Sequence, residues 1–160
     1  MDEGHLVPDD LITEVVRDRL GQPDCARGAI LDGYPRTETQ ATALEEIAGV
    51  GGIARCIVLD VPTAVVIERL SARRICSVCG TVFAWDAPEV CPKCGAEHAM
   101  VQRPDDVPEA IAERLSAYEH ETKPVIAHYE ERGLLSHVDA QGYPEEVFQR
   151  LCDLIDALHA

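Results

Sequence analysis

Apolar residues recur at helical spacing in several segments of this chain. Between Pro8 and Leu20, leucine, isoleucine and valine side chains return every three or four residues. This run stops at Gly21, with Pro23 close behind, which is a common way for a helix to end. Further helices are expected from Thr37, over 63–74, from Asp106, over 122–132 and over 144–158.

Three short apolar runs favour buried strands rather than helices. They are 29–35 (AILDGYP), 56–62 (CIVLDVP) and 134–140 (LLSHVDA). Because these runs alternate with the expected helices, the pattern predicts an α/β fold in which helices flank a parallel sheet.

Length and charge narrow the possible functions. The 160 residues suffice for one domain with a sizeable core and one small inserted module. The chain has 14 Lys and Arg against 29 Asp and Glu, a formal net charge of -15. This charge disfavours nucleic-acid binding, because affinity for a phosphate backbone depends on clustered basic side chains.

The sequence also argues against a membrane or secreted protein. No apolar run approaches the ~20 residues needed to cross a bilayer, and the first ten residues lack the basic start and apolar stretch of a signal peptide. Seven cysteines, four of them in two pairs, fit a reducing compartment and a metal site better than a disulfide framework. We therefore expect a cytoplasmic protein.

The four paired cysteines are the strongest chemical signal. Cys76 with Cys79, and Cys91 with Cys94, form two Cys-x-x-Cys pairs separated by eleven residues, and a glycine follows each pair. This spacing is typical of zinc, with a redox dithiol or an iron centre as the alternatives. Four thiolates leave no open position for water or substrate, so we expect a structural zinc ion that holds a hairpin together.

The module around the cysteines allows two interpretations. Arg69, Arg73 and Arg74 precede it and would suit a ribbon that binds nucleic acid or protein. However, the residues between the pairs do not form a basic face, and the module is inserted between a helix and Arg103 within an α/β chain. An inserted flap over a ligand site fits this arrangement better.

Six separated motifs resemble those of adenylate kinases of the long-lid bacterial type, whose lid carries zinc. In chain order they are GHLVPDDL, LDGYPRTETQA, ERLSARR, the four-cysteine insert, QRPDD and ERLSAYEHETKPV. The resemblance covers nearly the whole chain. It implies a nucleoside monophosphate kinase fold and an enzyme that transfers the γ-phosphoryl group of ATP to AMP reversibly, with magnesium, giving two ADP.

The resemblance also implies roles for five arginines, whose planar forks suit phosphate oxygens. Arg36 would grip the α-phosphate of AMP. Arg73 would reach the ATP phosphates from the lid, with Arg69 one helical turn before it. Arg103 and Arg114 would close on the transferring phosphoryl group, so we expect Arg36, Arg73, Arg103 and Arg114 to be catalytic.

Other residues receive binding roles from the same resemblance. The expected AMP contacts are His5, Leu6, Val7, Gly33, Tyr34, Pro35, Arg36, Gln40, Arg103 and Arg114. The expected ATP contacts are Arg69, Arg73, Val82, Phe83 and Gly142. Asp32 would orient hydrated magnesium. Gln40 has a second interpretation as a helix-capping side chain behind Thr37, and Asp105 and Asp106 would meet lid arginines, although a helix cap is the expected role of Asp106.

One family motif does not occur in the 160 residues. No G-x-x-x-x-G-K-[ST] phosphate loop is present, nor the strand that leads into it. Met1 is either an internal methionine taken as a start, which we favour, or the first residue of a short chain that has lost catalysis. In both cases we expect this chain alone to catalyse weakly or not at all, and its sheet to have a gap or an exposed edge.

The expected organisation has three parts and the expected protein is a monomer. Residues 1–72 would form the first part of the core, including the remnant of the AMP-binding flap, 73–102 the zinc lid, and 103–160 the second part of the core. One rival function is a non-catalytic zinc-ribbon protein that binds nucleotide or protein. A nearer rival is a kinase for another nucleoside monophosphate.

Overall fold

The computed structural model describes residues 8–84 and 86–158, which form two compact units. One unit consists of residues 61–115, and the other combines 8–60 with 116–158. In the described part of the chain, no helix is both long and apolar enough to pass through a bilayer.

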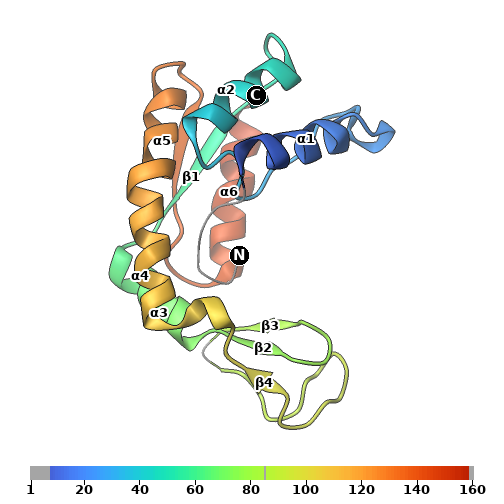
Figure 1. Ribbon diagram of the computed structural model, residues 1–160, viewed down its shortest axis with the longest axis vertical. Coiled ribbons are helices and arrows are strands. Elements are labelled where there is room, and N and C mark those ends of the chain that lie inside the picture. The colour runs from blue at the N-terminus through green and yellow to red at the C-terminus, as the bar shows by residue number, and fades with distance from the viewer. Residues whose placement is uncertain (1–7, 85, 159–160) are drawn as a thin grey trace. The chain divides into compact units, whose positions relative to one another are not determined.

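The unit that combines residues 8–60 and 116–158 is built around a pair of parallel strands. β1 (Cys56–Asp60) pairs with β5 (Leu135–Asp139), in register from Cys56 opposite Leu135 to Asp60 opposite Asp139. Helices α5 and α6 contact β5, and α2 contacts α5 (Figure 1). This arrangement confirms the parallel sheet flanked by helices and the two expected strands near residues 56 and 135.

The helices of this unit follow the expected pattern closely. They are α1 (Asp9–Leu20), the short η1 (Pro23–Cys25), α2 (Glu38–Ala48), the π-helical turn η3 (Tyr118–Thr122), α5 (Lys123–Glu130) and α6 (Pro144–Leu158). Gly21 caps α1, and the Thr37 hydroxyl caps α2 by accepting a hydrogen bond from Gln40 N at 3.2 Å. Ala41, Val125 and Tyr129 form the buried cluster where α2 and α5 meet.

The strand expected over residues 29–35 is wrong. This segment has no regular secondary structure, and Ile30 is 91% exposed. An apolar run becomes a strand only when a neighbouring strand satisfies its backbone. The parallel sheet of the described residues contains β1 and β5 alone, so this run has no strand to pair with.

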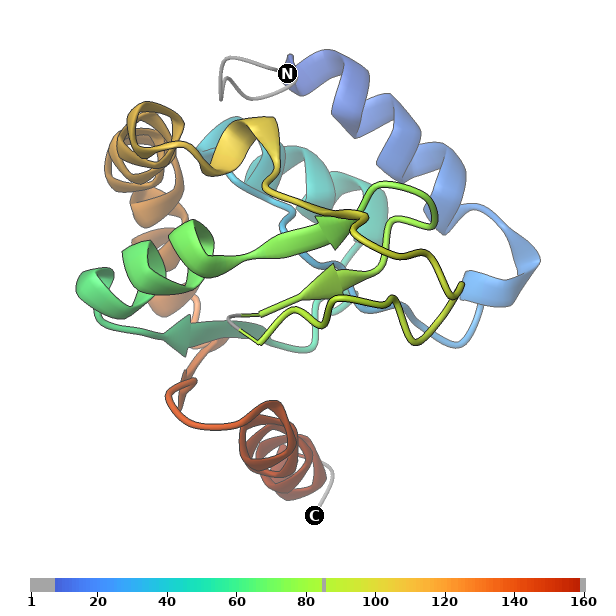
Figure 2. The same ribbon diagram turned by 90° about the horizontal axis from the view of Figure 1, so that it is seen from below.

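The unit of residues 61–115 carries the four cysteines. It contains α3 (Thr63–Ala72), β2 (Arg74–Cys76), β3 (Val82–Phe83), β4 (Met100–Val101), the short η2 (Pro104–Asp106) and the start of α4 (Pro108–Ala117). The three strands form an antiparallel sheet in the order β3-β2-β4, and most of the chain between β3 and β4 follows an irregular path (Figure 2). The expected zinc lid, 73–102, lies inside this unit, and its boundaries stay a prediction.

Candidate functional site

The four cysteines converge on one point. The sulfur atoms of Cys76, Cys79, Cys91 and Cys94 all lie within 4.8 Å of one another. Two of the sulfur pairs are 3.6 Å and 3.7 Å apart. Four thiolates around zinc at about 2.3 Å place neighbouring sulfurs about 3.8 Å apart in a tetrahedron. The observed separations therefore fit a tetrahedral metal ion.

The backbone around the cysteines forms two matching turns. Gly80 N donates to Cys76 O, and Gly95 N donates to Cys91 O, each at 2.8 Å. Both glycines have a positive φ, 71° and 74°, which a side chain would strain. The glycine after each pair is thus required by the turn that brings its two sulfurs together.

Thr81 supports one of the sulfurs. The hydroxyl of Thr81 lies 3.1 Å from the sulfur of Cys79. Hydrogen bonds from the side chain and backbone of Thr81 lower the pKa of Cys79 to about 6. Because a thiolate is the form that ligates metals, this neighbour favours metal binding.

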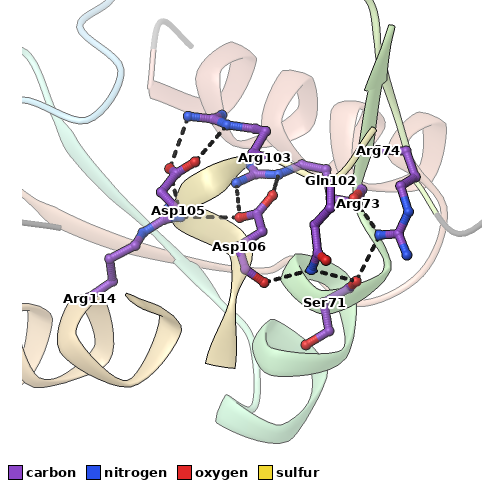
Figure 3. A network of polar contacts seen from close by, with 8 residues as sticks. All are labelled: Ser71, Arg73, Arg74, Gln102, Arg103, Asp105, Asp106 and Arg114. Atoms are coloured by element: carbon purple, nitrogen blue, oxygen red, sulfur yellow. Dashed lines mark hydrogen bonds and ion pairs between the residues drawn. The ribbon is translucent and has the colours of Figure 1, made fainter. Parts of the chain in front are cut away.

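The unit that carries the four cysteines also contains a network of arginines and aspartates (Figure 3). Asp106, which is fully buried, accepts two hydrogen bonds from Arg73, at 2.7 Å and 2.5 Å. This bidentate contact raises the pKa of Arg73. The side chain of Gln102 donates to Asp106 O at 2.8 Å and fixes the backbone of η2.

Asp105 organises the second half of the network. It accepts two hydrogen bonds from Arg103, at 2.9 Å and 3.0 Å. Arg114 reaches from α4 to both aspartates at longer distances, 3.4 Å to Asp105 and 3.5 Å to Asp106. The helix-cap role expected of Asp106 is wrong. Helix α4 begins at Pro108, and the Asp106 carboxylate pairs with Arg73 and Arg114 instead.

The network places three guanidinium groups around two carboxylates. A guanidinium fork that grips a carboxylate has the geometry to grip phosphate oxygens. The side chains of Arg103 and Arg114 are 39% and 36% exposed, whereas that of Arg73 is 22% exposed. Arg103 and Arg114 are therefore the more accessible to an incoming anion, and Arg73 is the more firmly held.

The other unit contains a second polar site at the N-terminus of α2. Arg36 Nε donates to Gly33 O at 2.8 Å, which folds the arginine back over the turn before α2. Gly33 has a φ of 71°, and a Cβ there would meet the guanidinium of Arg36 at 2.8 Å. The Tyr34–Pro35 peptide bond is cis. Gly33 is thus favoured by its backbone conformation, whereas the flexible end of the Arg36 side chain can move away from a Cβ at little cost.

Gln40 is the buried centre of this second site. Its side chain is only 3% exposed, and both ends of its amide have partners. Oε1 accepts a hydrogen bond from Arg36 N at 2.8 Å, and Nε2 donates to Asp9 Oδ1 at 2.7 Å. The helix-capping interpretation of Gln40 is met only in part: its backbone N–H donates to the Thr37 hydroxyl, but its side chain accepts from Arg36 N and not from the N-cap residue Thr37. Its contact with AMP stays a prediction.

Similarity to known proteins extends over nearly the whole chain. The family model described as "Adenylate kinase" matches residues 1–134. An adenylate kinase of Bacillus subtilis is 41% identical over 165 residues, covering 99% of this chain and 75% of that protein. Those of Desulfitobacterium hafniense and Clostridium tetani are 42% and 38% identical over 168 and 166 residues, covering 99% of this chain and 74% and 76% of theirs.

This chain belongs to the adenylate kinase family. It is a nucleoside monophosphate kinase sequence by this membership, and nothing in the comparisons favours a non-catalytic ribbon protein or a kinase for another nucleoside monophosphate. The family is one that acts on ATP, AMP and ADP and uses magnesium with ATP.

The remaining adenylate kinase positions expected from sequence lie in several elements. Asp32 is exposed in the turn after residue 31, Arg69 lies in the last turn of α3, and Val82 and Phe83 form β3. Gly142 has a φ of 100° in the loop after β5. The expected AMP contacts His5, Leu6 and Val7 lie outside the described residues.

Asp9 is the polar residue of this adenylate kinase chain that sequence reasoning missed. It lies in the first turn of α1, where acidic residues are common, so nothing in the sequence marks it out. Its partner Gln40 is 31 residues away, and no local spacing signals such a contact.

Proposed function

We propose that the site residues of this chain serve the reversible transfer of the γ-phosphoryl group of ATP to AMP, giving two ADP. The observation that carries the proposal is a cluster of three guanidinium groups on two aspartates, in which Arg73 and Arg103 make bidentate contacts and Arg114 makes longer contacts through one nitrogen. Phosphoryl transfer needs little covalent chemistry from the protein, so positioning and neutralisation of phosphate charge account for catalysis.

Each arginine has a distinct role in the proposal. Arg36 binds the phosphate of AMP, and Arg73 binds the phosphates of ATP while its Nε and Nη2 keep their contacts with Asp106. Arg103 and Arg114 leave their contacts with Asp105 when a phosphoryl group arrives and clamp its oxygens instead. The carboxylates hold the forks in position beforehand, so less conformational entropy is lost when phosphate binds.

The metals have separate roles. Cys76, Cys79, Cys91 and Cys94 would hold a structural zinc ion, which lets residues 73–102 move as one rigid lid. Magnesium supplies neutralisation of phosphate charge, and Asp32 would orient its water ligands. We further propose that the protein is a cytoplasmic monomer.

Nucleotide binding tests the AMP half of the proposal. Calorimetric titration of the zinc-loaded chain with AMP should show binding that Arg36→Ala abolishes. Arg27→Ala removes an exposed arginine of the same unit and should leave the binding unchanged. Equal AMP binding by all three proteins would contradict the role of Arg36.

Turnover tests the phosphoryl-transfer half. With AMP, ATP and magnesium, we expect slow ADP formation at most, because the 160 residues contain no phosphate-loop motif. Any activity that belongs to this chain should disappear in Arg103→Ala and Arg114→Ala. ADP formation that persists in both variants would contradict the proposed clamp.

A further inference from the structure

The Asp9 carboxylate joins the first turns of two helices. Oδ2 accepts a hydrogen bond from Thr37 Oγ1 at 2.8 Å, and Oδ1 accepts the one from Gln40 Nε2. Asp9 lies in the first turn of α1, whereas Thr37 is the N-cap of α2. One side chain thus ties the beginning of α1 to the beginning of α2.

These contacts fix which way the Gln40 amide points. A carboxylate can only accept hydrogen bonds and a backbone N–H can only donate one. The amide nitrogen must therefore face Asp9, and the amide oxygen must face Arg36 N. Turning the amide over would set N–H against N–H at Arg36 and oxygen against oxygen at Asp9.

The two hydrogen bonds of the Gln40 amide form a relay from Asp9 to Arg36 N, and burial makes this relay sensitive to Asp9. Gln40 is almost inaccessible to solvent, so water does not readily replace a lost partner of its amide. Without the Asp9 carboxylate, the Gln40 amide has to turn toward another partner. The hydrogen bond that Gln40 Oε1 accepts from Arg36 N is then lost as well.

We propose that Asp9 is a positioning residue for the AMP site: it orients the Gln40 amide and, through it, holds the backbone of Arg36. The link to AMP rests on the proposed role of Arg36 in binding the AMP phosphate. Asp9 itself touches no nucleotide in this account, and its negative charge would if anything repel one.

Two substitutions separate position from charge. Asp9→Ala removes both hydrogen bonds and the charge. Asp9→Asn removes the charge and can keep both contacts, because its Oδ1 can accept from Gln40 and its Nδ2 can donate to the hydroxyl of Thr37, which reverses the direction of that hydrogen bond. Asp10→Ala is the matched control, since Asp10 is an exposed acid in the same helical turn.

The test combines hydrogen exchange of the Arg36 backbone N–H with AMP titration of the zinc-loaded chain. In Asp9→Ala we expect Arg36 N–H to exchange about tenfold faster and AMP to bind about tenfold more weakly, the size of one lost charge-assisted hydrogen bond. Asp9→Asn should restore both values close to those of the unsubstituted chain, and Asp10→Ala should change neither. If Asp9→Ala does not fold, Asp9→Ser takes its place, since serine is too short to reach both partners.

Several outcomes would overturn the inference. Unchanged Arg36 exchange in Asp9→Ala means that Asp9 does not hold this backbone. Faster exchange with unchanged AMP affinity breaks the link to the AMP site, and failure of Asp9→Asn to rescue indicates an effect of charge instead. If the unsubstituted chain does not bind AMP, the proposed function fails, and the exchange measurement still decides whether Asp9 positions Arg36.

Discussion

The two compact units hold their polar side chains by different means. In residues 61–115, three arginines share two carboxylates, and the buried cluster beside the network is built around Cys76 and Cys91. In the other unit, one carboxylate and one amide form a relay beside an apolar cluster that includes Val125 and Tyr129. Charged groups and clustered cysteines dominate the first arrangement, and hydrogen bonds with apolar packing dominate the second.

This difference indicates what each arrangement can do. A phosphate can replace a carboxylate at an arginine without leaving the guanidinium unpaired. The first network therefore suits ligands that bind and dissociate. A buried amide with both ends satisfied cannot exchange partners cheaply, so the second network suits a fixed position.

Removal of the metal should unfold the cysteine module and spare the other unit. The buried cluster of the module consists of Cys76, Cys91 and Ala99, with few apolar groups around it to hold it together once the metal is lost. After chelation, NMR signals of residues 74–101 should collapse into a narrow range, while those of β1 and β5 stay dispersed.

A matched pair of cysteine variants checks that prediction. Cys76→Ser should reproduce the effect of chelation. Cys152 lies in α6, outside the cysteine module, so Cys152→Ser should not. Unchanged signals from residues 74–101 after confirmed loss of the metal would show that the module folds by its own packing.

Tyr129 provides the corresponding test of the other unit. It is 1% exposed, and Tyr129→Ala should lower the free energy of unfolding by about 3–5 kcal/mol through loss of packing. Its hydroxyl is buried without a hydrogen-bond partner among the described residues, and burial raises its pKa to about 12. Tyr129→Phe should therefore unfold at the same or a higher denaturant concentration than the unsubstituted chain. A marked loss of stability in Tyr129→Phe would reveal a partner for the hydroxyl.

A smaller effect should distinguish the two halves of the arginine network. Arg73→Leu leaves the fully buried Asp106 without its bidentate partner and should lower the free energy of unfolding by about 3 kcal/mol. Arg103→Leu removes a partner of Asp105, whose carboxylate can reach water instead. It should lower the free energy of unfolding by less than about 1 kcal/mol. Denaturant unfolding of the metal-loaded variants measures both, and equal costs would remove the distinction between a held and an accessible arginine.

Sequence alone predicted the features that depend on local spacing. The apolar periodicity placed α1 and α6, and the cysteine spacing with its two glycines placed the four-cysteine cluster. Features that depend on distant neighbours could not be read in the same way. The run at 29–35 has strand composition without a strand beside it, and Asp9 meets Gln40 across 31 residues.

The most direct test of the account is whether phosphate replaces aspartate in the arginine network. NMR signals of the guanidinium N–H groups report this exchange during titration of the zinc-loaded chain with magnesium ADP. We predict that the signals of Arg103 and Arg114 shift, while that of Arg19, which is exposed and paired with Asp24, stays in place. Saturation with nucleotide that leaves Arg103 and Arg114 unchanged would contradict the account, because their forks would then not be the phosphate clamp.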